Sequence, residues 1–596
     1  MKLKFLIVLL LLSGHLKAQN LNIIPQPRLV VNGSGQISIN NHSAIGISDT
    51  SLTALAIYFQ KELFKAKGLS PAINNGDSKS TIKLVLTNTN QTIGAYLLKI
   101  TPHQVTISSS NKEGVFYGLI SLLQVIKDHP KEGDNLTLAS TDATDVRDYQ
   151  NVVLASTEIT DAPRYQWRGL MLDESRHFFG KQKVMQILDW MAYYKLNKFH
   201  WHLTDVQGWR IEIKKYPRLT SVGGVGDYSD TLAETAPKYY TQNDIKEIVS
   251  YAAQRFITVI PEIDMPGHAT AANKAYPEYS GGSVAGYPNF TFNPAKEETY
   301  QYLANIIKET TALFPSKMMH LGGDEVVLGI KAWSLDTAIA RMMQNKGFED
   351  VGALERYFFK RMTDTVTSLG SKILAWDEAT QTELPTDKTI IFWWRQNLPG
   401  QLSLALQKNY QVVLCPRLPL YLDFLQDGTH ISGRNWKGEF NRYTDIYNFP
   451  DRQLAADQLT SNQIIGVQAN IWTEKIASEK RLDFMLFPRI AGLAEAGWTA
   501  PEIKNEAAFN ERVQAGLKNW DAADIYYFNP FDLQAHPEAV DFAPVIKKTT
   551  VMEKHGRHRK AGRLKSAKKG SRSAAKSRKS SSKVKTTKNK PHKKRK

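Results

Sequence analysis

Two adjacent carboxyl groups, Asp324 and Glu325, follow the glycine pair Gly322 and Gly323 at the end of a short apolar segment. Neighbouring charges after a strand are poor candidates for a core position, because burying an unpaired carboxylate is very costly. The glycines would let another molecule approach the backbone closely. A glutamate that transfers a proton, beside an aspartate that stabilises charge, suits acid-catalysed cleavage of a sugar bond. This motif alone leaves an exposed acidic turn open as the alternative.

From residue 168 onward the chain repeats a strand-then-helix pattern, and helices are predicted between most of the strands. The eight predicted strands cover residues 169–173, 198–203, 258–263, 318–321, 372–376, 389–393, 411–415 and 464–469. Eight such units over about 330 residues fit a (β/α)8 barrel of the α/β class. An open doubly wound sheet is the alternative, and the missing Gly-rich phosphate loop after any strand argues against it.

Each predicted strand is followed by side chains that could bind or react. Because barrel active sites form at the carboxyl ends of the strands, these side chains should converge on one rim. Three tryptophans among them would make a flat apolar wall for the C–H faces of a sugar, while acids and an arginine hold hydroxyls. In chain order the rim residues are Asp173, Arg176, His200, His202, Asp205, Glu262, Asp264, His268, Asp324, Glu325, Trp376, Asp377, Glu378, Trp394, Arg395, Tyr421, Asp423, Trp472 and Glu474.

A metal-dependent barrel hydrolase is a second interpretation. His200 and His202 lie two residues apart, so they share one face of a strand, and Asp205 follows them. No histidine lies at the predicted end of strands five to eight, so the further ligands of such a site are missing. We therefore predict no metal and no cofactor.

The spacing of the acid pair restricts the mechanism. Glycosidases usually place two carboxyl groups about 5 to 9 Å apart across the bond they cleave. Neighbouring residues have Cα atoms only about 3.8 Å apart, so Asp324 and Glu325 do not easily straddle a sugar. If Glu325 protonates the leaving oxygen, Asp324 could hold a nucleophile that the substrate supplies. The carbonyl oxygen of a 2-acetamido group, attacking C1, is such a nucleophile.

Several of these segments together resemble glycoside hydrolase family 20, the β-N-acetylhexosaminidases. The resemblance covers about residues 20 to 535 and implies a barrel preceded by a smaller domain. It also implies substrate-assisted catalysis, an exception to the two-carboxylate scheme. The matching segments are Ser175-Arg176-His177-Phe178, His200 to Asp205, His320 to Val326, Tyr421-Leu422-Asp423 and Trp472-Thr473-Glu474.

The resemblance implies catalytic roles for five residues. Glu325 would be the general acid and then the base that activates water. Asp324 would accept the acetamido N–H and stabilise an oxazolinium-like intermediate, and Tyr421 would donate to the acetamido oxygen. Asp205 and His268 would support Glu325 and tune its proton affinity.

It also implies sugar-binding roles. Arg176 would bind the 3- and 4-hydroxyls, and Asp423 and Glu474 would hold the 4- and 6-hydroxyls. Trp376, Trp394 and Trp472 would form a tryptophan wall that encloses the acetamido methyl and the sugar face. Trp393 is the alternative to Trp394 at the end of the same strand.

The predicted function is therefore that of an exo-acting retaining hydrolase. It would remove terminal β-linked N-acetylglucosamine or N-acetylgalactosamine from oligosaccharides and glycoconjugates. A sugar-binding pseudoenzyme is an alternative from another class, although every candidate catalytic residue is present.

The N-terminal segment resembles a secretory signal peptide. Lys2 and Lys4 precede an apolar run from residue 5 to residue 12, and cleavage is predicted near Ala18. The run is shorter than the roughly 20 residues that span a bilayer, which argues against an uncleaved anchor. Cys415 is the only cysteine, so no intramolecular disulfide can form. We predict a secreted or periplasmic protein without a transmembrane segment after signal removal.

Composition divides the rest of the chain. A smaller α+β domain is predicted over residues 19–160, the barrel over 161–505 and a helical extension over 506–546. Residues 547–596 contain 22 Lys and Arg against one acid, whereas the preceding residues contain 54 basic and 57 acidic side chains. With almost no apolar content, this C-terminal tail is predicted to be disordered. Its charge suggests adhesion to an anionic surface polymer or nucleic acid, the alternative being a solvated appendage.

Overall fold

The computed structural model describes residues 21–76, 79–128, 151–226, 236–436 and 438–541. The predicted signal peptide over 1–18 and the predicted basic tail over 547–596 lie outside these residues. In the described part of the chain, no helix combines the length and the apolar character needed to cross a bilayer.

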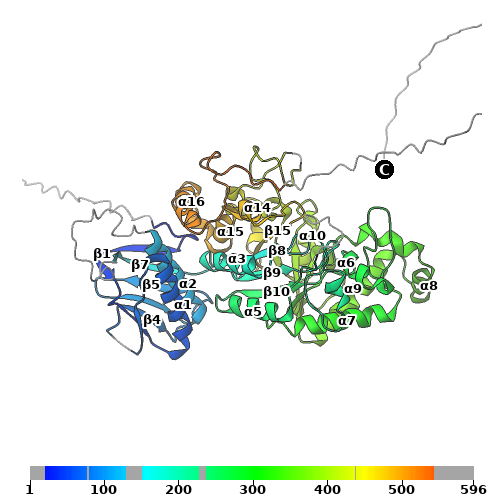
Figure 1. The fold of residues 1–596 in the computed structure, drawn as a ribbon, viewed down its shortest axis with the longest axis horizontal. Helices are drawn as coiled ribbons and strands as arrows, with labels where there is room; N and C mark the ends of the chain where they lie inside the picture. Colours follow the sequence, from blue (N-terminus) through cyan, green and yellow to red (C-terminus); the bar gives the residue numbers. More distant parts are fainter. Residues whose placement is uncertain (1–20, 77–78, 129–150, 227–235, 437, 542–596) are drawn as a thin grey trace, which may run out of the picture. The chain divides into compact units, whose positions relative to one another are not determined.

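The first described domain is a mixed seven-stranded sheet with the strand order β1-β7-β5-β6-β4-β2-β3. Two helices, α1 (Thr53–Lys67) and α2 (Lys112–Asp128), pack beside it, α2 mainly on β5 and β6 (Figure 1). The sequence predicted α2, β4 and β6 but not the other strands. The strands are β1 (Leu29–Ile39), β2 (Ala44–Ile47), β3 (Ala72–Asn75), β4 (Ile82–Leu86), β5 (Tyr96–Ile100), β6 (Val105–Ser109) and β7 (Val152–Asp161).

Helix α2 joins this sheet to the second domain. Its residues 114–126 are all buried, which is the pattern of a helix covered on every side. Tyr117 Oη accepts a hydrogen bond of 2.8 Å from Arg168 Nη2, and Gln124 Nε2 donates one of 2.9 Å to the Tyr193 carbonyl. The apolar faces of α2 therefore pack the two domains against each other.

The second domain is a closed barrel of eight parallel strands, paired in chain order from β8 to β15, with β15 returning to β8. The predicted (β/α)8 fold is confirmed, and each strand begins and ends within two residues of its prediction. The strands are β8 (Trp167–Asp173), β9 (Lys198–His202), β10 (Thr258–Glu262), β11 (Met318–His320), β12 (Lys372–Trp376), β13 (Thr389–Trp393), β14 (Gln411–Leu414) and β15 (Ile464–Ile471).

Closure of the barrel depends on Gly466 in β15. A Cβ atom at this position would lie 1.8 Å from the carbonyl oxygen of Trp167 in β8. A side chain here would separate the first and last strands, so only glycine permits this pairing.

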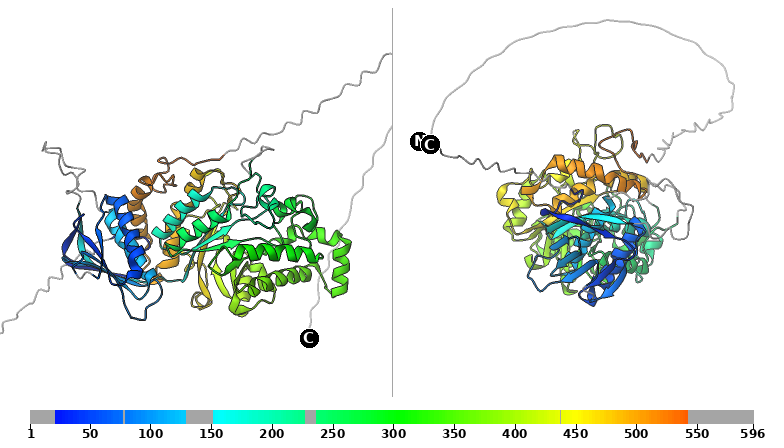
Figure 2. Two further views of the ribbon diagram at one scale, coloured as in Figure 1. Left: turned by 60° about the horizontal axis from the view of Figure 1, so that its bottom comes forward. Right: turned by 90° about the vertical axis from the view of Figure 1, so that its left-hand side faces the viewer.

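Helices surround the barrel (Figure 2). One connection departs from the repeat, because residues 377–388, all of them described, join β12 to β13 by two 3-10 helices, η5 (Asp377–Gln381) and η6 (Thr386–Lys388), with no α-helix. The α-helices of this domain are α3 (Lys181–Tyr193), α4 (Arg218–Ser221), α5 (Gln242–Ala253), α6 (Thr270–Ala275), α7 (Glu297–Thr311), α8 (Thr337–Lys346), α9 (Val351–Ser368), α10 (Pro399–Gln407), α11 (Arg417–Leu420), α12 (Tyr443–Tyr447), α13 (Ala456–Leu459), α14 (Glu479–Leu486), α15 (Arg489–Trp498) and α16 (Glu506–Asp521).

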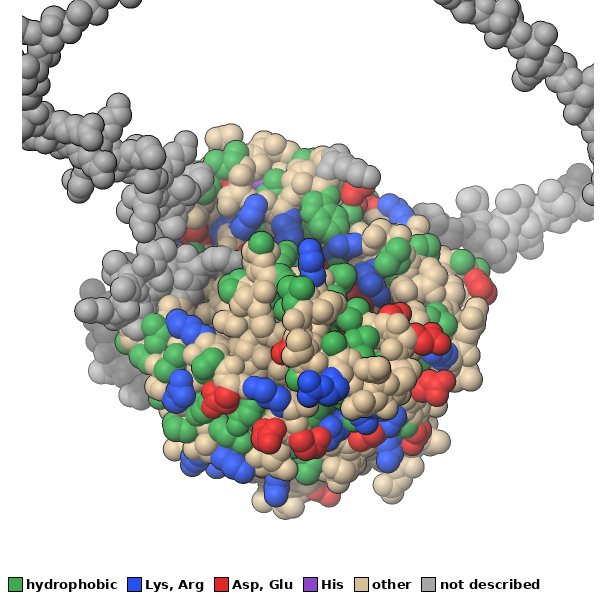
Figure 3. Space-filling model, turned by 90° about the vertical axis from the view of Figure 1, so that its right-hand side faces the viewer, with side chains coloured by type: hydrophobic (Ala, Val, Ile, Leu, Met, Phe, Trp, Pro, Cys, Tyr) green, Lys and Arg blue, Asp and Glu red, His purple; other side chains and the backbone are tan. Residues whose placement is uncertain are grey.

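The surface near α8 carries charges of both signs. Figure 3 shows Lys and Arg side chains interspersed with Asp and Glu over this face. This agrees with the near balance of 54 basic and 57 acidic residues outside the predicted tail.

Candidate active site

Two glycines shape the turn that carries the acid pair after β11. Gly322 has a φ of +64°, and a Cβ atom there would lie 1.7 Å from Asp264 Oδ1. Gly323 has a φ of +87°, and its Cβ atom would lie 2.7 Å from the Phe359 ring. The sequence predicted that these glycines admit another molecule. In the structure they instead make room for side chains of the same chain, and no larger residue fits.

Asp324 and Glu325 differ in their surroundings. The side chain of Asp324 is 13% exposed and that of Glu325 is 44% exposed. Burial raises the pKa of Asp324 to about 7, against the attraction of His268 and with the repulsion of Glu325 adding to it. Within the described chain, Asp324 Oδ1 has no hydrogen-bond partner. A ligand donor can therefore bind Asp324, while Glu325 can exchange protons with solvent.

Asp205 and His268 lie beside both acids. Nδ1 of His268 is 2.9 Å from Asp205 Oδ1, and its Nε2 is 3.7 Å from both Asp324 Oδ2 and Glu325 Oε2. Burial opposes the charged imidazole, but Asp205 and Asp324 raise the pKa of His268 to about 9. Burial also opposes ionisation of Asp205, but Arg176 and His268 hold its pKa well below the usual range.

Arg176 is held on the rim by polar and aromatic contacts. Its Nη2 is 2.7 Å from Asp205 Oδ2, its Nη1 is 3.4 Å from Asp173 Oδ2, and its Nε donates to Gln207 Oε1 at 3.1 Å. Its guanidinium carbon lies 4.9 Å from the centre of the Trp472 ring. These contacts fix the guanidinium, so its remaining N–H groups have a defined direction.

Four aromatic residues form a wall over the barrel mouth. The Trp376 and Tyr421 rings each lie 6.0 Å from the Trp472 ring, and Trp394 is parallel to Tyr421 within 8° at 6.3 Å. Trp393, the competitor, packs into the main hydrophobic core instead. The structure therefore brings Trp394 to the wall.

Asp423 and Glu474 share one arginine. Arg434 Nε lies 2.6 Å from Asp423 Oδ2, and Arg434 Nη2 lies 2.8 Å from Glu474 Oε1. Burial raises the pKa of Asp423 to about 7, with Arg434 opposing and Glu474 adding to the effect. Asp423 Oδ1 and Glu474 Oε2 find no hydrogen-bond partner in the described chain, so both can accept from a ligand. Arg434 was not among the predicted site residues, because it lies in a loop and belongs to no motif.

Glu262 is a second residue whose importance the sequence analysis missed, although it was noted at a strand end. It is fully buried inside the barrel. Its Oε1 accepts from Trp376 Nε1 at 2.9 Å and lies 2.8 Å from His320 Nδ1. Its Oε2 lies 2.5 Å from His202 Nδ1 and 3.1 Å from His200 Nε2.

These contacts bear on the metal-dependent alternative. Three groups of possible donor residues have ligand atoms within 4.8 Å of one another: His200, Glu262 and His320; His202, Asp205 and Asp264; and Asp264, His268 and Asp324. Glu262 in the first group and Asp205 in the second already face the chain's own N–H groups, whereas Asp264 Oδ1 has no hydrogen-bond partner in the described chain. Burial and the charge of Asp324 raise the pKa of Asp264 well above its usual range. The contacts of Glu262 and Asp205 therefore favour a structural role for His200, His202 and His320 inside the barrel over a role as metal ligands.

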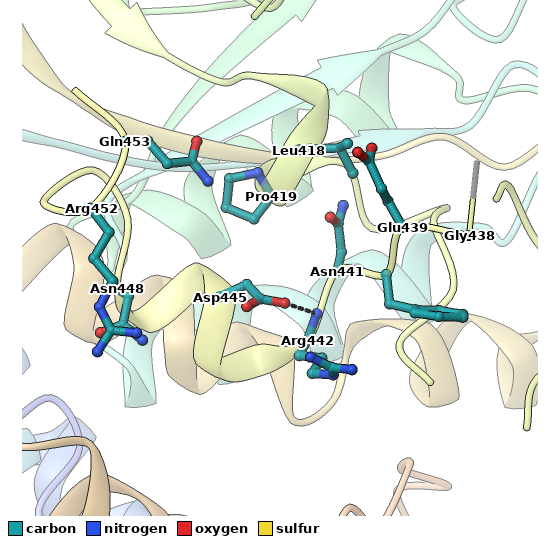
Figure 4. A pocket seen from close by; sticks show the side chains of 11 residues that line it. Leu418, Pro419, Gly438, Glu439, Asn441, Arg442, Asp445, Asn448, Arg452 and Gln453 are labelled. Carbon is teal, nitrogen blue, oxygen red and sulfur yellow. Dashed lines mark hydrogen bonds between the residues drawn. The ribbon is translucent and has the colours of Figure 1, made fainter. Parts of the chain in front are cut away.

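A cavity of about 410 Å³ opens in the loops after β14 (Figure 4). Its lining includes Pro419, Asn441, Arg442, Asp445 and Arg452, and Asp445 accepts from the backbone N–H of Arg442 at 3.0 Å. None of the predicted site residues lines it, so it is separate from the acid pair.

Comparison with known proteins identifies the family. The profile described as "Glycosyl hydrolase family 20, catalytic domain" matches residues 165–501, and "Glycosyl hydrolase family 20, domain 2" matches residues 20–162. The chain belongs to glycosyl hydrolase family 20. The family indicated by the sequence motifs and the enzyme class, a glycoside hydrolase, are thereby confirmed.

Individual family 20 proteins are similar over most of their length. The beta-hexosaminidase of Vibrio furnissii is 32% identical over 502 residues, covering 80% of this chain and 77% of the relative. The exo β-N-acetylglucosaminidase of Vibrio harveyi, solved with N-acetylglucosamine, has a TM-score of 0.76 at 28% identity, covering 86% and 79%. The Streptomyces plicatus N-acetyl-β-hexosaminidase, solved with thio-NAglucal, has a TM-score of 0.72 at 28% identity, covering 86% and 97%.

Proposed function

We propose that this chain is an exo-acting, retaining β-N-acetylhexosaminidase that removes terminal N-acetylglucosamine or N-acetylgalactosamine from glycans. The observation that carries the proposal is the arrangement of Asp324 and Glu325. Both lie 3.7 Å from one nitrogen of His268, but Asp324 is largely buried with Oδ1 unpartnered in the described chain, which suits it to accept an acetamido N–H, whereas the more exposed Glu325 can protonate the leaving oxygen. The nucleophile must then come from the substrate, and a 2-acetamido group can supply it.

The residues divide the reaction between them. Glu325 protonates the glycosidic oxygen as its bond to C1 breaks, while the acetamido carbonyl oxygen forms a bond to C1. The buried carboxylate of Asp324 accepts the acetamido N–H and stabilises the positive charge of the oxazolinium ring. Tyr421 donates to the acetamido oxygen. Glu325 then removes a proton from the water that attacks C1, the bond between C1 and the acetamido oxygen breaks to restore the acetamido group, and two inversions give overall retention.

The rim accounts for the choice of a terminal sugar. The aromatic wall of Trp376, Trp394, Tyr421 and Trp472 receives the acetamido methyl and the apolar sugar face. Arg176 binds the 3- and 4-hydroxyls, and Asp423 and Glu474 accept from the 4- and 6-hydroxyls. Arg434 holds these two acids together, and acids that bind a free 4-hydroxyl select the non-reducing terminal sugar, which favours exo action.

The test is hydrolysis of a chromogenic β-N-acetylglucosaminide by wild type and Glu325→Gln. Loss of a general acid should lower the rate by about 10² to 10⁴. An unchanged rate would remove Glu325 from the mechanism. A β-glucoside without the 2-acetamido group should be a poor substrate, and rapid turnover of it would contradict the substrate nucleophile. Tight sugar binding without turnover by wild type would favour the pseudoenzyme alternative.

Secretion or a periplasmic location is part of the proposal, supported by the composition of residues 1–18. The proposed contact of residues 547–596 with an anionic polymer is supported by their charge alone. Cell fractionation with N-terminal sequencing of the mature protein tests the location, and an intact N-terminus in the cytoplasm would contradict it.

A further inference from the structure

Alternating carboxyl and imidazole groups form a chain from the centre of the barrel to the acid pair. His202 Nδ1 lies 2.5 Å from Glu262 Oε2, and His202 Nε2 lies 2.9 Å from Asp205 Oδ2. Asp205 Oδ1 continues to His268 Nδ1 at 2.9 Å, and His268 Nε2 faces Glu325 Oε2 at 3.7 Å. The proposed function uses only the outer half of this carboxylate–imidazole chain, Asp205 and His268.

The inner half is a buried charge pair. Both ring nitrogens of His202 face carboxylate oxygens, which only accept, so both nitrogens carry a proton. Burial disfavours this cation, but Glu262 and Asp205 raise the pKa of His202 to about 10. His320 and His202 hold the pKa of Glu262 well below its usual range, against the effect of burial.

His202, rather than its neighbour His200, connects Glu262 to the residues of the rim. His200 also lies 3.1 Å from Glu262, but burial lowers the pKa of His200 to about 4, so it is neutral near pH 7. His200 Nδ1 contacts Gln468 Nε2 at 3.0 Å instead of a group on the rim. The other charged or titratable groups that face the carboxylate–imidazole chain are Arg176, Asp264, His320, Asp324 and Glu325.

We propose that Glu262 and His202 are positioning residues for the glycosidase reaction. Glu262 keeps His202 doubly protonated. His202 in turn keeps Asp205 ionised and oriented, so that its second oxygen holds Nδ1 of His268. His268 then presents Nε2 to Glu325 in a fixed direction. The inference rests on the proposed function for its kinetic consequences.

The main test is Glu262→Gln, which keeps the shape but cannot stabilise an imidazolium. We expect kcat to fall about 10- to 100-fold with KM nearly unchanged, because an acid and its support move out of alignment. Both limbs of the pH profile of kcat/KM should shift upward by on the order of one pH unit. The reason is that the positive charge lost at His202 is hydrogen-bonded directly to Asp205, whereas the negative charge lost at Glu262 is separated from Asp205 by the His202 ring.

Two more variants separate charge from packing. His202→Asn removes the cation and leaves Glu262 charged, so its alkaline shift should be the larger one. His200→Asn is the matched control, since His200 is equally buried and contacts Glu262 but not Asp205. Its pH limbs should coincide with those of wild type. The proposal would be overturned if Glu262→Gln folds but its pH profile of kcat/KM has the same limbs as wild type. It would also be overturned if His202→Asn and His200→Asn shift the limbs equally.

A measurement independent of turnover keeps the inference separate from the proposed function. In ¹⁵N spectra of ring-labelled histidine, His202 should be an imidazolium at pH 8 in wild type and neutral in Glu262→Gln. A neutral His202 in wild type would overturn the carboxylate–imidazole chain even if the enzyme is active. An inactive wild type with a charged His202 would instead refute the proposed function.

Discussion

Replacing Asp324 by asparagine should stabilise the protein while abolishing most of its activity. A carboxyl group whose pKa is about 7 when folded and near 3.8 when unfolded costs about 4 kcal/mol of stability above pH 7. The buried amide that replaces it costs about 1 to 3 kcal/mol if its hydrogen bonds are not made. The free energy of unfolding of Asp324→Asn should therefore exceed that of wild type by about 1 to 3 kcal/mol at pH 8.

The gain should depend on pH in a defined direction. The folded pKa of Asp324 is raised, so its cost is absent below the unfolded pKa, grows as pH rises from about 4 to about 7, and is constant above that. At pH 4.5 most of the gain should be lost. Urea denaturation of wild type and Asp324→Asn across this pH range measures the difference in the free energy of unfolding. The rate at which Asp324→Asn hydrolyses a β-N-acetylglucosaminide should be about 10²- to 10³-fold below that of wild type.

Asp205→Asn is the paired control, because it makes the same substitution on the same rim. Arg176 and His268 hold the pKa of Asp205 low despite burial, so the charge of Asp205 stabilises the folded state at neutral pH. Its replacement should lower the free energy of unfolding by about 3 to 5 kcal/mol, the cost of leaving buried partners unpaired. Equal signs for the two variants at pH 8, or an Asp324→Asn effect that is the same at pH 4.5 and pH 8, would refute the electrostatic reasoning.

Three further predictions concern other parts of the chain. Arg434→Ala should raise KM about tenfold with a smaller effect on kcat, as measured by steady-state kinetics. Without the arginine between them, Asp423 and Glu474 would repel each other and leave the positions that hold the sugar hydroxyls. Asp161→Asn should lower the free energy of unfolding by about 3 kcal/mol without changing kcat, as urea denaturation and steady-state kinetics can check. The reason is that Asp161 Oδ2 lies 3.2 Å from Nζ of the fully buried Lys195, and the substitution removes the negative charge that pairs with it. Truncation after residue 546 should leave kcat/KM unchanged and weaken retention on heparin at low salt, and unchanged retention would exclude polyanion binding by the tail.

Most of the barrel could be predicted because parallel strands are buried on both faces and read as short apolar runs. Met318–His320 is such a run, and its end locates Asp324 and Glu325. The N-terminal sheet was harder, because strands such as Leu29–Ile39 are mostly exposed and carry little apolar pattern. The four-residue strand Ala72–Asn75 is shorter than any periodic signal.

Site residues were predictable where a strand end fixes their place. Arg434 was not, because it reaches Asp423 from a loop whose path depends on tertiary packing. Glu262 was visible at a strand end, but its role needs the positions of His202 and His320 on the neighbouring strands. The function of Gly322 also required the structure, since Asp264 rather than a ligand fills the space beside it.

A crystal structure with N-acetylglucosamine or a thiazoline-type analogue bound would show whether the substrate's acetamido group is placed to act as the nucleophile. We expect the acetamido group to lie inside the wall of Trp376, Trp394 and Trp472, with its nitrogen at hydrogen-bond distance from Asp324 and its oxygen near Tyr421. An acetamido group directed away from Asp324 into solvent would contradict the substrate as nucleophile.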